Sequence, residues 1–154
     1  MLSRRVLLTG SSALLLSSCA SGGLGRKSEY FTDFRGRSLH GYDSVAYHQD
    51  RKAVRGDETF EEEWKGVRWR FANAENRDLF VANPERWAPQ YGGYCAWGVA
   101  ARNMLLQTDP LVFRIFDDKL YLNRNLTIHR TWLGNYKAFI ADADENWPGL
   151  VNTG

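Results

Sequence analysis

The sequence predicts a small α+β domain in which short antiparallel β-hairpins pack with two or three helices. Two stretches, Thr59–Ala72 and Leu111–Asn123, carry apolar residues on both sides of a turn and predict β-hairpins. Two others, Ala74–Ala82 and Leu126–Ala143, are predicted to be helices. Hairpins followed by helices are typical of the α+β class.

The first predicted strand is Ser44–His48, and Lys52–Arg55 is its expected partner. In Thr59–Ala72, aromatic residues alternate with glutamates before Lys65-Gly66 and with arginines after it. We therefore expect a β-hairpin whose glutamates and arginines pair on the solvent face. A helix over Asp57–Lys65 is the alternative, because three glutamates favour helix.

Asn73 is a suitable N-cap for the helix at Ala74–Ala82. Its expected inward-facing residues are Leu79, Phe80 and Val81. Asn83-Pro84 ends this helix, and Pro84 begins another turn in which Trp87 is expected to pack on the hairpin.

The remaining predicted elements are a short helix at Cys95–Ala101, strands at Leu111–Phe116 and Leu120–Asn123, and a helix at Leu126–Ala143. That last helix has an expected break near Gly134, and Trp147-Pro148 ends it. We find no internal repeat in the sequence.

Residues 1–18 have the layout of an export signal. Arg4-Arg5 precedes apolar leucine-rich runs and small residues, as in a twin-arginine signal. Leu16–Cys19 resembles a bacterial lipobox, which predicts cleavage before Cys19 and lipidation of its thiol. Because Ala20 is not aspartate, we expect outer-membrane attachment with the domain facing the periplasm. An ordinary secretory signal with a chance cysteine is the alternative.

Residues 19–38 are predicted to be a flexible tether and residues 39–150 the folded domain. The formal net charge falls from +2 to zero when the signal is removed, because Arg4 and Arg5 leave with it. A neutral protein offers no electrostatic argument for nucleic-acid binding. One free thiol, Cys95, then remains, so no intramolecular disulfide is expected.

The stretch Gln90–Trp97 predicts a shaped pocket around this thiol. Two glycines permit a sharp bend, and three aromatic residues crowd the cysteine. The expected pocket residues here are Tyr91, Gly92, Gly93, Tyr94 and Trp97, and the turn at Tyr42 and Asp43 is expected to join them. Asp43 is expected to bond backbone groups in its turn.

Candidate co-ligands for Cys95 are His40, His48, His129 and Met104, a set that would suit copper. None lies within three residues of Cys95, so no compact ligand motif supports a metal site. His40 is the best histidine candidate. We expect His48 at the surface or as a cap, His129 facing solvent and Met104 in packing. A merely buried Cys95 is an equal alternative.

Several stretches together resemble the YHS-domain family, in its exported branch. They are Gly41–Tyr47, Trp69–Phe80, Asn83–Pro89, Gln90–Ala96, Asp118–Asn123 and Ala143–Pro148. The resemblance implies a small metal-related domain, and in this branch the cysteine segment can carry selenocysteine. The positions that match the family's ligand cysteines hold Ala46 and Ala72, so the usual metal site is not carried over.

Three functional hypotheses follow. The first is a non-enzymatic, lipid-anchored YHS domain that binds copper, zinc or a small ligand at Cys95 with His40. The second is a thiol-redox protein using Cys95. The third is a non-catalytic module that binds an envelope protein partner.

Overall fold

The computed structural model describes residues 28–151. The predicted signal peptide, the predicted lipidation site Cys19 and the first part of the predicted tether lie outside these described residues. The described chain contains helices and two small antiparallel two-stranded sheets, so the predicted α+β class is confirmed. None of the helices in residues 28–151 has the length and apolar character that a membrane span needs.

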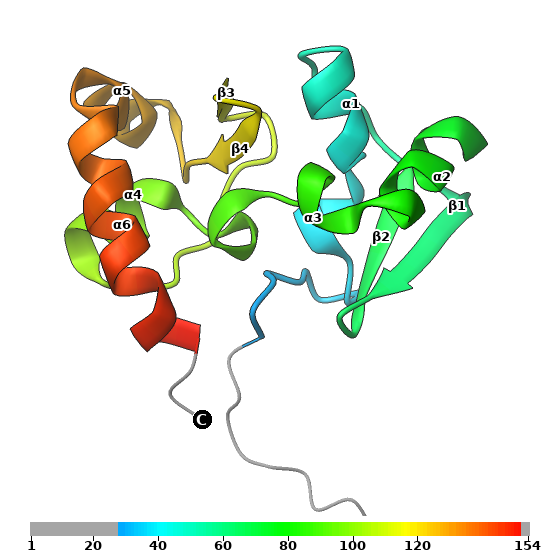
Figure 1. Cartoon of the computed structure of the whole chain (residues 1–154), viewed down its shortest axis with the longest axis horizontal. Helices are drawn as coiled ribbons and strands as arrows, with labels where there is room; N and C mark the ends of the chain where they lie inside the picture. Colours follow the sequence, from blue (N-terminus) through cyan, green and yellow to red (C-terminus); the bar gives the residue numbers. More distant parts are fainter. Residues whose placement is uncertain (1–27, 152–154) are drawn as a thin grey trace, which may run out of the picture.

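The elements form two groups that lie side by side in Figure 1. The first contains η1 (Ser38–Gly41), α1 (Ser44–Gln49), β1 (Asp57–Trp64), β2 (Val67–Phe71), α2 (Ala74–Ala82) and α3 (Pro84–Trp87). The second contains η2 (Gln90–Gly93), α4 (Ala96–Arg102), β3 (Phe113–Phe116), β4 (Lys119–Leu122), α5 (Leu126–Gly134) and α6 (Tyr136–Val151). Each group therefore has the order turn, helix, hairpin, helix, helix.

The two groups repeat one backbone path with a shift of 52 positions. Helices α2 and α5 begin and end 52 residues apart, and so do the first residues of α3 and α6. The two hairpin turns also correspond, with φ of 51° and 72° at Lys65-Gly66 and 48° and 56° at Asp117-Asp118. We refer to residues 38–87 as the first half and residues 90–151 as the second half.

The turns η1 and η2 share an uncommon left-handed backbone. Their φ values are 50°, 54° and 82° at Leu39, His40 and Gly41, and 51°, 58° and 82° at Tyr91, Gly92 and Gly93. In each turn the N–H of the following tyrosine donates to the carbonyl of the first left-handed residue. Tyr42 donates to Leu39 at 3.0 Å, and Tyr94 donates to Tyr91 at 2.9 Å. Both turns lead directly into the N-cap of a short helix.

The equivalent N-cap residues are Asp43 and Cys95. The Asp43 N–H bonds the Val54 carbonyl at 2.8 Å, and the Cys95 N–H bonds the Leu106 carbonyl at 2.9 Å. These partners are again 52 positions apart.

The repeat is a correction to the sequence analysis, which found none. Between the first half and its shifted counterpart, five pairs of positions hold the same residue: Gly41 and Gly93, Tyr42 and Tyr94, Asp57 and Asp109, Asn73 and Asn125, and Asn83 and Asn135. Four pairs lie in turns or caps, and in the fifth the Asp57 and Asp109 side chains each accept the N–H two residues ahead. Backbone geometry restricts residue choice at such positions. The core positions differ, so hydrophobic patterning does not show the repeat.

Asp43 connects three elements of the first half. Its Oδ1 accepts from the N–H groups of Val45 and Ala46 at 2.8 and 3.1 Å, which begins α1. Its Oδ2 accepts from the Ala72 N–H at 2.8 Å and the Asn76 amide at 2.7 Å. The side chain is fully buried, so the expectation that Asp43 bonds backbone groups is confirmed.

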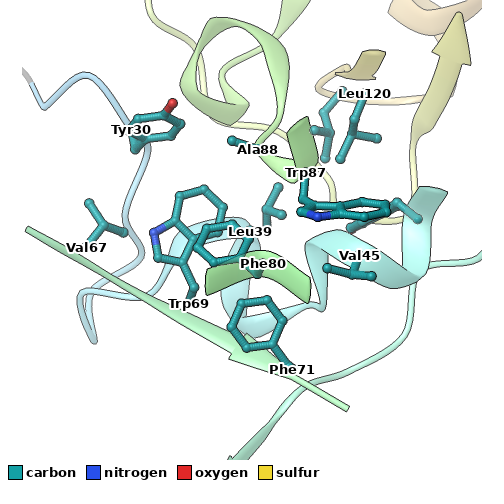
Figure 2. Packing of buried hydrophobic residues seen from close by; sticks show 12 residues of the cluster. Tyr30, Leu39, Val45, Val67, Trp69, Phe71, Phe80, Trp87, Ala88 and Leu120 are labelled. Carbon is teal, nitrogen blue, oxygen red and sulfur yellow. The ribbon is translucent and has the colours of Figure 1, made fainter. Parts of the chain in front are cut away.

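Each half has its own hydrophobic cluster. In the first, Trp69, Phe71 and Phe80 pack ring against ring, with centroids 4.8 Å apart for Trp69–Phe80 and 5.0 Å for Phe71–Phe80 (Figure 2). Leu120 and Leu122 of β4 also belong to this cluster, so the halves share apolar contacts. Trp87 joins it, as expected.

Most predicted elements are confirmed within a few residues, including both hairpins, the Asn73 cap and the break near Gly134. The cross-strand pairing is confirmed by Arg70 Nε, which lies 2.7 Å from Glu61 Oε2. The predicted strand Ser44–His48 is wrong, because the Asp43 cap starts helix α1 there. Lys52–Arg55 forms only an isolated bridge, from Arg55 to Tyr42.

Two further expectations are wrong. Val81 is 52% exposed, because it lies on the outer side of α2. Helix α6 continues through Trp147-Pro148 to Val151. Its last turns are held by Trp147, whose ring centroid lies 5.8 Å from that of Tyr91.

Replacing Asp43 with alanine leaves three backbone N–H groups and the Asn76 amide without their acceptor. We expect Asp43→Ala to lower the free energy of unfolding by about 3–5 kcal/mol, measured by urea unfolding with circular dichroism. Asp57→Ala is the control, because Asp57 also accepts an N–H two residues ahead but at the surface. A loss no larger than that of the control would contradict the connecting role.

Candidate functional site

Cys95 does not line an open pocket. Its exposed fraction is 0%, and it lies between η2 and α4 with a parallel bridge from its backbone to Leu122. The expected accessible cavity around its sulfur is therefore wrong. Cys95 is the N-cap residue of α4, the position equivalent to the buried Asp43, but its side chain makes no capping hydrogen bond.

The sulfur belongs to a buried polar chain. The Cys95 thiol donates to Asn123 Oδ1 at 3.5 Å, and the same oxygen accepts the Trp97 N–H at 3.2 Å. The Asn123 amide then donates to His129 Nδ1 at 3.0 Å. His129 is buried, so its expected solvent exposure is wrong. Sequence analysis missed Asn123, because it carries no motif.

Burial raises the pKa of the Cys95 thiol above its ordinary value. The backbone N–H groups of Gly98, Arg124 and Trp97 act in the opposite direction but do not outweigh it. A buried protonated thiol is a poor nucleophile and a poor metal ligand, because both roles need the thiolate. The structure therefore favours a structural role for Cys95.

The predicted aromatic neighbours have other partners. The Tyr91 hydroxyl donates to Asp144 at 2.8 Å, and the Tyr94 hydroxyl donates to the Ser28 carbonyl at 3.2 Å. Trp97 lies under the Arg102 guanidinium, 5.3 Å from its ring centroid. Tyr91 therefore contacts α6, Tyr94 contacts the N-terminal segment, and Trp97 packs with Arg102 within α4. The polar atoms of these side chains do not converge on the sulfur.

The paired glycines have a packing role. The Gly92 carbonyl accepts the Phe31 N–H at 2.8 Å, and a Cβ on Gly92 would lie 1.8 Å from the Glu29 carbonyl oxygen. Gly93 carries a φ of 82°. The glycines thus let the N-terminal segment cross the second half in direct backbone contact.

A hollow of about 640 Å³ lies elsewhere, between η1, the N-terminal segment and the start of the second hairpin. Its lining comprises Phe31, Thr32, Asp33, Phe34, Arg37, His40, Tyr42, Arg55, Gln107, Asp109, Pro110 and Leu111. Two predicted site residues, His40 and Tyr42, are brought together here. Cys95 is not among the lining residues, so the structure separates the predicted pair Cys95 and His40 into different sites.

His40 is held in place at the wall of the hollow. Its Nε2 donates to the Thr108 carbonyl at 3.1 Å, and its ring lies 4.8 Å from the Phe31 ring. The His40 backbone has φ of 54°, a conformation that side chains with a Cβ rarely adopt. The equivalent position in the second half is Gly92, which adopts the same conformation without that cost.

Charged groups surround the hollow. Arg37 binds Asp33 through two guanidinium nitrogens, at 2.6 and 2.8 Å. The Arg55 guanidinium lies 5.0 Å above the centre of the Tyr42 ring. Asp109 accepts the Leu111 N–H at 2.9 Å. No motif marks these charged residues in the sequence, because they come from three separate segments that meet only in the fold.

The other predicted ligands lie apart. His48 packs edge-on against Trp87, with ring centroids 5.5 Å apart, and Met104 is 52% exposed instead of packed. Asp43 is used fully by its hydrogen bonds and does not line the hollow. In the described part of the chain, no three histidine, cysteine, aspartate or glutamate side chains are placed to hold a metal ion together.

Comparison of the chain with protein-family models, with curated proteins and with solved structures finds no match.

The buried thiol gives a pH-dependent prediction. In the full chain with Cys19→Ser, so that Cys95 is the only thiol, we expect native alkylation by iodoacetamide to be at least about tenfold slower than in urea. The native rate should rise only above the pH at which an ordinary thiol ionises, near pH 8.5. Rapid native alkylation with a midpoint below that pH would show an accessible thiolate instead.

Two histidines with lowered pKa values should make the fold less stable in acid. Burial, with Arg86 and Arg51 nearby, lowers the pKa of His48 from 6.5 to about 4, and burial with Arg114 lowers the pKa of His129. Between pH 6.5 and 4 the unfolded chain therefore binds more protons than the folded chain. The free energy of unfolding should be highest above pH 6.5 and fall as the pH is lowered through this range.

Urea unfolding at several pH values measures this slope. His48→Gln removes one of the two groups and should make the slope shallower, by up to about 1.4 kcal/mol per pH unit. A wild-type stability that stays constant from pH 6.5 to pH 4 would contradict the prediction.

Proposed function

We propose that this chain is an exported, lipid-anchored domain of the YHS type that binds a small organic ligand in the hollow beside His40 and Tyr42. The observation that carries this proposal is the strained backbone of His40 at the wall of the hollow. The proposal moves the ligand site away from Cys95, which is enclosed.

The equivalent turn of the second half has glycine where the first half has His40. A non-glycine residue in the left-handed region costs on the order of 1 kcal/mol, and such costs are concentrated at functional sites. Gly92 shows that glycine satisfies this backbone in the equivalent turn. The imidazole of His40 is therefore present for its side-chain contacts, and those contacts place it on the hollow.

The hollow has the character of a binding site. Its volume of about 640 Å³ lies within the range for small-molecule sites, and it lies between two structural units, where such sites are common. It combines aromatic surface from Phe31 and Tyr42 with charged groups from Arg55 and Asp109. This mixture favours binding an organic molecule over a bare metal ion.

Its place in the chain fits an anchored protein. Phe31 lines the hollow and follows the predicted lipidation site, Cys19, by only twelve residues. Even a fully extended tether of this length spans about 40 Å. An anchored domain would therefore hold the hollow close to the membrane surface.

The other hypotheses have weaker support. A copper or zinc site at Cys95 lacks a neighbouring set of ligands in the described residues, and a redox thiol would need a lower pKa than burial allows. Titration with Cu(I) and Zn(II), repeated with Cys95→Ser, tests the metal hypothesis directly. An envelope partner remains a proposal that the hollow neither requires nor opposes.

A fragment screen tests the proposed function. We expect amide signals of hollow residues to shift in ¹H–¹⁵N spectra of the full chain in detergent when small organic acids, amines and amino acids are added. His40→Ala should weaken these effects about tenfold by removing the imidazole. Shifts centred on Cys95, or none near the hollow, would contradict the proposal.

His40→Gly is the matched variant. It removes the same side chain but also removes the backbone strain, so its free energy of unfolding should exceed that of His40→Ala by about 1 kcal/mol. Both variants should lose binding equally. A glycine variant that is stable and still binds would show that the imidazole has no role in the site.

A further inference from the structure

The charges around the hollow indicate which class of molecule it accepts, an inference that rests on the proposed function. One pair of charges is already neutralised. Asp33 bonds the Arg37 guanidinium and also accepts the backbone N–H groups of Arg35 and Arg37, both at 2.9 Å. These contacts hold the pKa of Asp33 below its ordinary value, so this pair has little charge left for a ligand.

Two charges of opposite sign remain. Across residues 28–151, no carboxylate forms an ion pair with Arg55, whose guanidinium instead lies over the Tyr42 ring. Asp109 likewise pairs with no arginine or lysine in the described chain and uses Oδ1 to accept the Leu111 N–H. The hollow therefore presents one guanidinium and one carboxylate that a ligand can neutralise.

Apolar surface accompanies these charges. Phe34 and Leu111 line the hollow and are 90% and 61% exposed, although large apolar side chains gain from being covered. Phe31 and Pro110 extend this surface on the same lining. A ligand that covers these side chains needs an apolar body as well as its charged groups.

We infer that the hollow binds a small zwitterion with an apolar body, such as a free amino acid or a very short peptide. The ligand carboxylate pairs with Arg55, where a guanidinium can donate two parallel hydrogen bonds. The ligand ammonium pairs with Asp109, and the apolar body lies against Phe34 and Leu111. The first half supplies the cation and the second half the anion, so the site depends on the junction of the repeats.

Four ligands that share one aromatic body test this assignment: phenylalanine, phenylpropanoate, phenethylamine and phenethyl alcohol. Their binding to the full chain in detergent is measured by calorimetry and by ¹H–¹⁵N spectra. We expect phenylalanine to bind about tenfold more tightly than either singly charged ligand, and phenethyl alcohol to bind most weakly.

Variants assign each charge to its residue. Arg55→Gln should lower the affinity for phenylalanine and phenylpropanoate about tenfold and leave the affinity for phenethylamine unchanged. Arg55→Lys should retain part of the preference for ligands with a carboxylate. Asp109→Asn should lower the affinity for phenylalanine and phenethylamine and leave the affinity for phenylpropanoate unchanged. Thermal unfolding of each variant confirms that it is folded.

Two matched controls lie outside the hollow. Arg102→Gln removes another arginine that lies over an aromatic ring, 5.3 Å from Trp97, but away from the hollow. Asp57→Asn alters the counterpart of Asp109 in the first half, where the Asp57 carboxylate accepts the Thr59 N–H at 2.8 Å. Neither control should change the affinity of any of the four ligands.

The outcomes separate the two proposals. If all four ligands shift the amide signals of the hollow residues and bind with similar affinity, the zwitterion assignment fails and the hollow remains a binding site. If phenylpropanoate equals phenylalanine and Asp109→Asn has no effect, the site binds anions and the assignment is again overturned. If none of the four shifts the hollow at millimolar concentration, the assignment fails, and the wider fragment screen decides the proposed function.

Discussion

Asp43 accepts four hydrogen bonds inside the first half, and three of their donors are backbone N–H groups. One carboxylate thus fixes the start of α1 and the end of β2. Through Asn76, it also fixes which face of α2 lies toward these elements. A buried carboxylate is stable only when such donors surround it, so these elements must keep their relative positions. The left-handed turn η1 leads directly into this residue and is positioned with it.

The second half stabilises the corresponding N-terminus, that of α4, with different side chains. Cys95 takes the N-cap position, and Asn123 accepts the Trp97 N–H while its amide bonds His129. A neutral thiol and a neutral amide here replace one carboxylate. This explains why a lone cysteine among aromatic residues looks reactive in the sequence but is enclosed in the structure. The Cys95 side chain makes no capping hydrogen bond, because Asn123 accepts the Trp97 N–H in its place, and burial keeps the thiol protonated.

Local signals predicted local structure well. The Asn73 cap, the turn at Lys65-Gly66 and the alternation of Thr59–Ala72 identified their elements, because neighbouring residues determine caps and hairpins. Ser44–His48 was misassigned, because its helix depends on the buried Asp43 and thus on residues about thirty positions away. The repeat was missed, since caps and turns recur at its 52-residue spacing whereas core residues do not.

The candidate site was only half predictable for a related reason. His40 and Tyr42 lie in a turn that sequence analysis identified, but Arg55 and Asp109 reach the hollow from segments with no motif. The hollow draws on non-equivalent positions of the two copies of this backbone. His40 and Arg55 correspond to Gly92 and Gln107, so at these two positions the first half carries a strained backbone and a charge that the second half lacks. The hollow therefore combines His40 and Arg55, which differ between the repeats, with Tyr42 and Asp109, which both repeats share.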